Sequence, residues 1–399
     1  MRVFLSSLLC AAILGYRAGA VVIDDFSMTS QKFLSSGVPE GFTLDLNEER
    51  LVQFAEDDKP VWITEREKIR AKALGRKFFD ITHTPWFKRP PTSLAPSLAY
   101  PAPDKQNLVN TVIANLTVDG MISNLQKFTS FRTRYYRSET GKESQKWLLN
   151  RISEITAEYA SPSLTYLITL TEFTHPWGQN SIILKIKGAS EAAAVENGTV
   201  VIGAHQDSAN TIPFLPAPGA DDDGSGTVTI LETYRGLLAS NYTPVQDVEF
   251  HWYSAEEGGL LGSQAVAQSY AQENVNIHSM VQFDMTAWVK RGTREEIGIV
   301  TDYVDADLTE FIRTLVNTYC GIPYVDTQCG YACSDHASWG KAGYRSAFGI
   351  ESTFDNSDKN IHSTNDRMDI SDEFSFDHML EFSKLAVGYI IETAGWSKL

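Results

Sequence analysis

The chain has 399 residues, of which 43% are hydrophobic and 21% charged, so it is long enough for one large or two ordinary globular domains. This composition excludes a disordered or fibrous protein. The formal net charge of -16 and the lack of any run rich in lysine and arginine argue against a nucleic-acid partner.

The first 20 residues have the pattern of a secretory signal peptide. A basic start at Arg2 is followed by a short apolar core and an Ala-x-Ala sequence that ends at Ala20. A membrane anchor is the alternative, but the apolar run is too short to span a bilayer and Arg17 interrupts it. We therefore expect cleavage after Ala20 and an extracellular protein without a membrane-spanning segment.

Residues 21–99 differ in pattern from the remainder of the chain. The sequence Thr64-Glu-Arg-Glu67 has the capping-box pattern that begins a helix, which we expect to run towards Lys77 in a segment with few aliphatic strands. Six of the 15 prolines then lie between Pro85 and Pro103, which is typical of an extended linker open to proteases. Behind a signal peptide, this organisation favours the propeptide of a zymogen. The alternative is a small accessory domain that stays attached.

From residue 100 to residue 399, helical and strand patterns alternate, and we expect one domain. Strand patterns occupy residues 181–187, 199–203, 245–253, 280–285 and 297–301. Helical patterns occupy residues 148–159, 224–240, 308–319 and 379–390. Such alternation predicts an α/β fold with three layers, helix, sheet and helix, around a mostly parallel central sheet.

Residues with metal-binding side chains follow several of the predicted strands. In chain order they are His205 with Asp207, Asp221-Asp222-Asp223, Glu256-Glu257, Asp284 and His362. In open α/β sheets, ligands bind beyond the carboxyl ends of the strands. Imidazole and carboxylate together are the ligand set of zinc, and no thiolate is needed. A core histidine or a solvated acidic helix start is the better explanation of a single cluster taken alone, whereas the clusters together predict a metal site.

Two of these clusters have a further chemical interpretation. His205 can bind a metal through one ring nitrogen while Asp207 accepts the proton of the other. In the pair Glu256-Glu257, one carboxylate can bind a cation and leave the other free as a general base that acts on a bound water. The triple acid before the glycine-rich turn at residues 224–226 excludes a phosphate, which three carboxylates would repel.

Secretion determines how the cysteines are interpreted. Cys329 and Cys333 are close enough in sequence for a local disulfide, and the alternative, a zinc half-site, lacks a second half nearby. Cys320 is then expected to be buried and free. The chain also contains three N-glycosylation sequons, at Asn115, Asn197 and Asn241. They fit a secreted glycoprotein, although such tripeptides also arise by chance.

Five of these motifs resemble, in order and spacing, those of the secreted di-zinc leucyl aminopeptidases of bacteria and fungi. The matching stretches are His205-Gln-Asp207, Gly219-Ala-Asp-Asp222-Asp-Gly-Ser-Gly226, Ala255-Glu256-Glu257-Gly258, Asp284-Met285 and Ile361-His362-Ser363. The resemblance covers about residues 100–399. The loop that begins Cys329-Gly-Tyr331-Ala-Cys333 is also similar to the disulfide-bounded loop of the family. The resemblance implies a zinc exopeptidase fold of the phosphorylase/hydrolase-like type.

The resemblance implies two zinc ions with shared ligands. His205 and Asp284 would hold one ion, and Glu257 and His362 would hold the other. Asp222 would bridge both ions, since the family pattern selects it among the three consecutive acids.

The resemblance also implies the catalytic residues and the substrate pocket. Glu256 would be the general base, the hydroxyl of Tyr331 would help to stabilise the tetrahedral oxyanion, and Asp207 would orient His205. An apolar pocket would be lined by Met285, Phe348, Ile350, Phe354 and Ile361. Ordinary core packing is the alternative for these five residues.

The expected protein is thus a secreted metalloprotease that removes the N-terminal residue, preferably leucine or another apolar residue, from peptides with a free N-terminus. Its own propeptide is the other expected partner, and we expect a monomer that binds neither nucleic acid nor membrane. Two alternatives remain, one from another class of protein and one that is also an enzyme. A non-catalytic binding protein would tolerate loss of Glu256, and a single-zinc acyltransferase of the glutaminyl cyclase type would not release an unmodified N-terminal residue.

Overall fold

The computed structural model describes residues 37–55, 58–85 and 100–397. The predicted signal peptide and residues 86–99 of the proline-rich linker lie outside the described residues. Within those ranges, every helix is too short or too polar to traverse a lipid bilayer.

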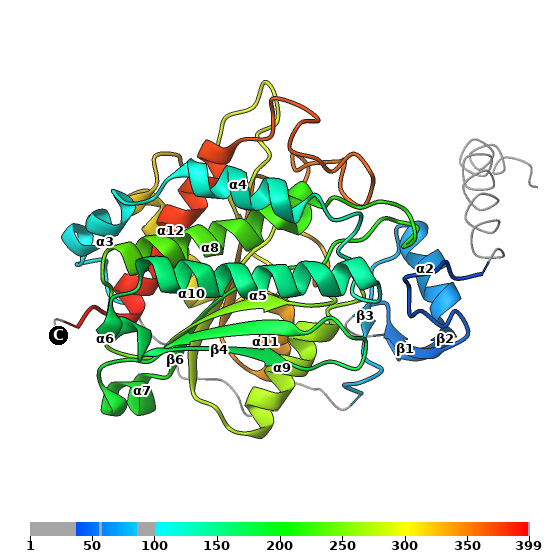
Figure 1. Ribbon diagram of the computed structural model, residues 1–399, viewed down its shortest axis with the longest axis horizontal. Helices are drawn as coiled ribbons and strands as arrows, with labels where there is room; N and C mark the ends of the chain where they lie inside the picture. The colour runs from blue at the N-terminus through cyan, green and yellow to red at the C-terminus, as the bar shows by residue number, and fades with distance from the viewer. Residues whose placement is uncertain (1–36, 56–57, 86–99, 398–399) are drawn as a thin grey trace, which may run out of the picture.

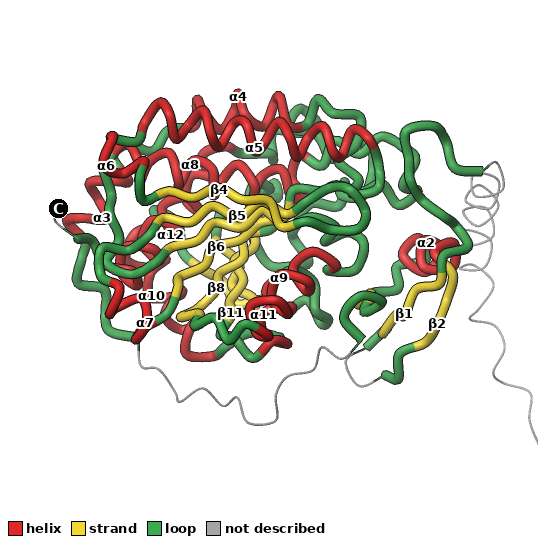
Figure 2. Tube along the Cα trace, turned by 60° about the horizontal axis from the view of Figure 1, so that its bottom comes forward, coloured by secondary structure: helices red, strands yellow, loops and turns green. Residues whose placement is uncertain are grey.

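A mixed sheet of eight strands forms the centre of the molecule (Figure 2). Its order is β10-β9-β11-β8-β6-β7-β5-β4. The strands are β4 (Ile168–Phe173), β5 (Ser181–Ile186), β6 (Thr199–His205), β7 (Val248–Tyr253), β8 (Ile277–Phe283), β9 (Ile297–Val300), β10 (Tyr324–Thr327) and β11 (Ser346–Ile350). The pairs β6–β7, β6–β8, β8–β11 and β9–β10 are parallel, and β4–β5, β5–β7 and β9–β11 are antiparallel. The predicted α/β class with a mostly parallel central sheet is confirmed.

Helices pack against the sheet through side chains that alternate along its strands. Along β5, Ile182, Leu184 and Ile186 belong to a large apolar cluster, whereas Ile183 belongs to a second, smaller one. The large cluster includes α3 (Gln106–Ile113), α5 (Glu139–Tyr159), α8 (Gly226–Ala239), α10 (Ala306–Tyr319) and α12 (Phe376–Ala394). The small cluster includes α9 (Leu261–Gln272) and α11 (His336–Ala342). Side chains of one strand point to opposite faces, so both faces of the sheet are covered.

The remaining helices lie around this core (Figure 1). They are α4 (Val118–Phe128), α6 (Pro162–Thr165), α7 (Glu191–Asn197) and the short π-helical turn η1 (Ala220–Ser225). The helix predicted at residues 148–159 lies within α5, and its apolar residues Leu148, Ile152 and Ile155 are fully buried. The helix begins where Ser138 accepts a hydrogen bond from the amide of Gly141.

The N-terminal segment, residues 37–85, carries its own small sheet (Figure 1). It consists of β1 (Glu49–Gln53), β2 (Val61–Thr64) and β3 (Phe79–Asp80) with the helix α2 (Glu65–Ala73). The capping box is confirmed: the Thr64 side chain accepts from the amide of Glu67, and the Glu67 carboxylate accepts from the amide of Thr64. The helix ends at Ala73, before Lys77, because Gly75 adopts a positive φ of 75°.

The short strands of this segment were not located from the sequence, for a physical reason. In β1 a charged residue, Arg50, takes an interior position and is fully buried. Its guanidinium lies 2.8 Å from Asp80 and 3.5 Å from Glu65, which compensates the charge. A buried arginine interrupts the apolar alternation by which strands are predicted.

The N-terminal segment packs on the larger domain. Leu44, Leu46 and Ile69 form one apolar cluster with Ile212 and Phe214. The ring of Phe42 meets that of Phe214 edge-on at 5.2 Å. Backbone hydrogen bonds also join the N-terminal segment to the larger domain. In one of them the amide of Glu139 donates to the carbonyl oxygen of Gly41 at 2.8 Å.

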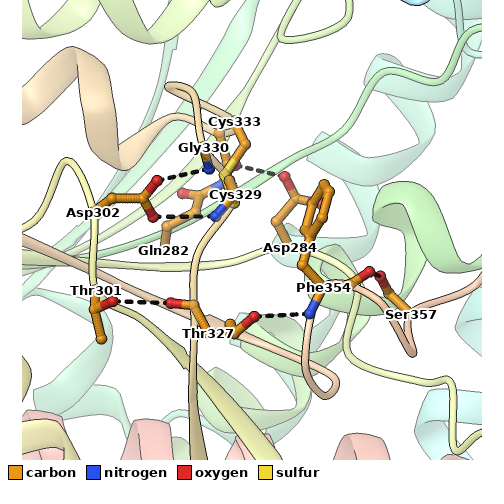
Figure 3. The surroundings of a disulfide bond; sticks show 11 residues. Gln282, Asp284, Thr301, Asp302, Thr327, Cys329, Gly330, Cys333, Phe354 and Ser357 are labelled. Atoms are coloured by element: carbon orange, nitrogen blue, oxygen red, sulfur yellow. Dashed lines mark hydrogen bonds between the residues drawn. A yellow bond between two sulfur atoms is a disulfide. The ribbon is translucent and has the colours of Figure 1, made fainter.

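The structure locates the predicted disulfide, the third cysteine and the three sequon asparagines. The disulfide between Cys329 and Cys333 is present, with the Cα atoms 6.2 Å apart (Figure 3). Cys320 is free, but it is only partly buried, because it ends α10 close to the surface. The three sequon asparagines, Asn115, Asn197 and Asn241, are all exposed.

Candidate metal centre

The predicted ligands come from five segments that meet at the carboxyl ends of the central strands. His205 is the last residue of β6, and Asp284 directly follows β8. Glu257 lies in the loop after β7, and Asp222 lies in η1, just before α8. His362 comes from the long connection between β11 and α12. Because β6, β7 and β8 are parallel neighbours, their carboxyl ends bring these side chains together.

Asp222 lies between two groups of side chains. Its Oδ1 is 3.0 Å from Nε2 of His205, and its Oδ2 is 3.1 Å from Nε2 of His362. On the first side, Oδ1 of Asp284 is 3.6 Å from the same His205 nitrogen. On the second side, Oε2 of Glu257 is 3.0 Å from the His362 nitrogen. One carboxylate thus joins two sets that each consist of a histidine and an acid.

These residues fit the chemistry of zinc. His205 is fully buried, and within the described part of the chain its Nε2 has no hydrogen-bond partner although carboxylate oxygens surround it. A buried imidazole nitrogen that faces only carboxylates is a natural ligand of a divalent cation. The second set, Asp222, Glu257 and His362, can likewise place one ligand atom each around a single ion.

The neighbouring acid, Asp223, has a different function. It lies close enough to His205 and Asp284 to share an ion. Its oxygens, however, accept hydrogen bonds from the backbone amides of His205 at 3.0 Å, Gly226 at 2.8 Å and Met285 at 3.1 Å. We therefore assign Asp223 to holding the ends of β6, α8 and β8 together, not to binding a metal.

Asp207 holds the loop that carries the two glutamates. Its carboxylate accepts the amides of Glu256 at 3.0 Å and Glu257 at 3.2 Å. The other ring nitrogen of His205, Nδ1, is 3.1 Å from the backbone oxygen of Asp207 and 3.5 Å from its carboxylate. Asp207 thus lies against His205 as expected, but its nearer atom is the carbonyl oxygen.

Two further residues that support the centre were not assigned a function from the sequence. Asp366 accepts the amides of Asp221 at 2.7 Å and Asp222 at 3.2 Å. The hydroxyl of Ser334 donates to Asp284 at 2.5 Å. Ser334 follows the disulfide directly, so the disulfide-bounded loop is linked to a predicted ligand. Asp366 follows His362 in the same polar loop, which is the one sequence signal that could have indicated it.

The backbone is constrained at the same place. Ala255, Met285 and His362 adopt positive φ angles of 58°, 60° and 55°, which residues with a Cβ rarely adopt. Each is a candidate site residue or lies beside one. Such conformations persist only where surrounding contacts fix them, and they cluster at functional sites.

The electrostatics reflect an excess of carboxylates around two imidazoles. Burial alone would raise the pKa of Asp222, but the imidazoles of His205 and His362, one beside each of its oxygens, hold that pKa well below its ordinary value. Burial would lower the pKa of His362, yet the neighbouring carboxylates of Glu257 and Asp222 raise it to about 9. Burial is the main cause that raises the pKa of Glu256 well above its ordinary value. His205 opposes this rise, and the nearby carboxylates add to it. A divalent cation would relieve this excess of negative charge.

A cavity of about 230 Å³ opens over these groups. Its lining includes Asp222, Glu256, Glu257, Asp284 and His362. The predicted pocket residues Met285, Phe348, Ile350, Phe354 and Ile361 line the same cavity. The five residues also pack together as an apolar cluster, as the alternative of core packing expects.

Three residues of the disulfide-bounded loop, Tyr331, Ala332 and Cys333, line this cavity. Figure 3 shows the disulfide of this loop near Asp284 and Phe354. Asp302 fixes the loop by accepting the amides of Cys329 at 3.1 Å and Gly330 at 2.7 Å. Tyr331, which lies between the two cysteines, contributes to the lining, and its ring meets that of Phe354 edge-on at 6.2 Å. Phe354 is in turn tied to the strand β10 through Thr327, at 2.8 Å.

Comparison with known proteins agrees with these observations. Residues 181–386 match the profile of peptidase family M28, a range that contains all five predicted ligands. Leucine aminopeptidase 1 of Metarhizium robertsii is 45% identical over 344 residues, 84% of this chain and 84% of that protein. Leucine aminopeptidase 1 of Emericella nidulans is 47% identical over 346 residues, 84% of this chain and 86% of that protein. The crystal structure of the Legionella pneumophila LapA aminopeptidase is similar, with a TM-score of 0.75 and 28% identity over 90% of this chain and 97% of that chain.

Proposed function

Because the chain belongs to peptidase family M28 and is a zinc-dependent aminopeptidase, we propose that it releases leucine or another apolar residue from the free N-terminus of peptides. We propose that it uses two zinc ions and a glutamate base. The position of Asp222 carries this proposal, since its two oxygens lie 3.0 and 3.1 Å from two different imidazoles.

In this proposal each ion has three protein ligands. His205 and Asp284 hold one ion, Glu257 and His362 hold the other, and Asp222 serves both. When bound, the zinc ions supply Lewis acidity and lower the pKa of a bound water. Asp207, Asp223 and Asp366 position the ligands through backbone amides.

Glu256 is the general base. Its carboxylate lies 3.9 Å from Nε2 of His205, so it is close to the centre, and among the described residues it belongs to neither group of side chains that could share an ion. The raised pKa of Glu256 makes its carboxylate a stronger proton acceptor than an exposed glutamate. Glu256 takes a proton from water and passes it to the leaving amine.

Tyr331 faces the same cavity and can donate a hydrogen bond to the developing oxyanion. Burial, followed by the nearby carboxylates, raises the pKa of Tyr331 above its ordinary value, so its phenol stays protonated at neutral pH. The apolar wall of Met285, Phe348 and Ile350 favours a leucine-like side chain, and one methylene more or less changes that preference by about 1–3 kcal/mol.

We propose further that residues 1–20 are a signal peptide, that residues 21–99 are a propeptide, and that residues 100–399 form a secreted, monomeric catalytic domain of three layers. The exposed sequons at Asn115, Asn197 and Asn241 support glycosylation. The propeptide would stay bound until the proline-rich linker is cut.

The test of the activity is hydrolysis of leucine p-nitroanilide. The chain is assayed before and after limited proteolysis of the linker, alongside N-acetyl-leucine p-nitroanilide and a chelator control. We expect hydrolysis of the free-amine substrate alone, abolished by the chelator and restored by zinc. Equal hydrolysis of the acetylated substrate, or no hydrolysis by zinc-loaded and cleaved protein, would overturn the proposal.

A further inference from the structure

The helix α2 of the N-terminal segment contacts the loop that carries the two glutamates. The ammonium group of Lys72 donates to the backbone oxygen of Glu257 at 2.9 Å. Lys68, one helical turn earlier, donates to the backbone oxygen of Gly258 at 3.4 Å. The amide of Asp80 donates to the backbone oxygen of Gly259 at 3.1 Å. Three consecutive residues of the loop after β7 are thus bound by the N-terminal segment.

One of these contacts involves a carboxylate oxygen of the metal centre. Oε1 of Glu257 accepts the amide of Ala209 at 2.9 Å, so Oε2 is the oxygen left to face His362. The ammonium of Lys72 lies 2.5 Å from this same Oε2. A zinc ion held by Glu257 and His362 would need that oxygen and would be repelled by the ammonium beside it.

The N-terminal segment also holds Lys72 firmly in place. On the same helix, Lys68 forms buried ion pairs with Glu65 and Asp80, both at 2.9 Å. The strand β1 supports Asp80 in turn through Arg50. Because α2 is anchored in this way, the Lys72 side chain has a high effective concentration at Glu257.

The residues that follow α2 narrow the cavity itself. Gly75, Arg76, Lys77 and Phe78 all belong to its lining. The ammonium of Lys77 lies 4.7 Å from the centre of the Tyr331 ring, which places a second cation of the segment in the substrate pocket.

We propose that Lys72 is a tethered ammonium that competes with the zinc ion at Glu257 and His362. While the N-terminal segment is docked, this site binds zinc weakly and the site of His205 and Asp284 binds it normally. Release of the segment after cleavage removes the competitor and allows the second ion to bind. The inference deepens the proposed function and rests on its two-zinc centre.

The test measures metal binding and needs no activity. Zinc is titrated by calorimetry into the metal-free full chain, and bound zinc is counted by elemental analysis. Wild type is compared with Lys72→Met and with Lys77→Met. Lys77→Met is the matched control, because it removes a cation of the same segment that lies against the Tyr331 ring and not against Glu257. Lys72→Gln serves as a second variant, and thermal melting confirms that each protein is folded.

We expect wild type and Lys77→Met each to bind one zinc ion tightly. Their affinity for the second ion should be at least about tenfold lower than that of Lys72→Met, a difference of about 1.4 kcal/mol in binding free energy. The chain cleaved in its linker and freed of the segment should bind both ions like Lys72→Met. Equal second-site affinity in wild type and both Lys72 variants would overturn the proposal, as would an equal gain in Lys77→Met. Fewer than two ions in every form, including the cleaved chain, would overturn the two-zinc centre itself.

Discussion

Replacing Glu256 by glutamine removes the proposed proton acceptor while it keeps the size of the side chain. General-base catalysis contributes about 10²- to 10⁴-fold, so kcat should fall by that factor, equivalent to about 2.7–5.5 kcal/mol of transition-state stabilisation. Zinc content should stay near that of wild type, because Glu256 is 3.9 Å from His205 and makes none of the short contacts around Asp222. The amide of residue 256 would still donate to Asp207, so the loop should keep its position.

The assay combines steady-state hydrolysis of leucine p-nitroanilide with elemental analysis of the same protein, for wild type, Glu256→Gln and Glu256→Ala. KM should change little, since the side chain contributes to the proton transfer and not to the apolar wall. A kcat within tenfold of wild type at full zinc content would refute the assignment of Glu256 as the base. A loss of one zinc ion in Glu256→Gln would instead make this residue a ligand and refute the geometry of the proposed centre.

Four further outcomes follow from the same contacts. Asp222→Ala should lose zinc from both sites, which elemental analysis measures, and its kcat/KM should fall at least about 10³-fold, which steady-state kinetics measures. Asp366→Ala leaves two buried amides without an acceptor and should lower the free energy of unfolding in urea by about 2–5 kcal/mol. Phe354→Ala should reduce kcat/KM for leucine p-nitroanilide about 10- to 200-fold more than for alanine p-nitroanilide. The pKa of His362 rises from 6.5 to about 9 on folding, so its protonation stabilises the metal-free fold below pH 6.5, and this contribution is lost as the pH rises to about 9. Zinc needs the neutral imidazole, so over the same range the Tm of metal-free protein should fall while zinc affinity in calorimetry rises.

The sequence could indicate the candidate metal centre because its residues follow a local rule. Apolar periodicity locates β6, β7 and β8, and the polar residues that follow each strand must meet where parallel strands end. His205, the pair Glu256-Glu257 and Asp284 were located in this way, whereas the choice of Glu257 within the pair depended on a resemblance. The choice of Asp222 among three acids was not available from periodicity and depended on a resemblance. The structure gives its physical basis, since the oxygens of Asp223 are occupied by backbone amides.

Contacts between distant parts of the chain were beyond sequence reasoning. Lys72 and Glu257 are 185 residues apart, and nothing in the pattern of a charged, capped helix indicates which side chain faces the cavity. The strand β1 could not be predicted from the sequence for a related reason. Its buried Arg50 is stabilised by Asp80, which lies 30 residues later in the chain. A charge that is compensated only in the folded state looks like a surface residue in the sequence.

The two glycines after Glu257 connect the catalytic loop to the docked segment. The sequence marks Gly258 and Gly259 as a turn, and Gly259 does adopt a positive φ of 103°. A Cβ at Gly259 would also lie 2.7 Å from the amide nitrogen of Asp80, closer than real contacts allow. The absence of a side chain therefore lets β3 approach the loop, in addition to permitting the turn. Residues 256–259 contain the proposed base and a proposed ligand, and the N-terminal segment binds the backbone oxygens of residues 257, 258 and 259. The segment therefore cannot make all of these contacts without lying against the candidate metal centre.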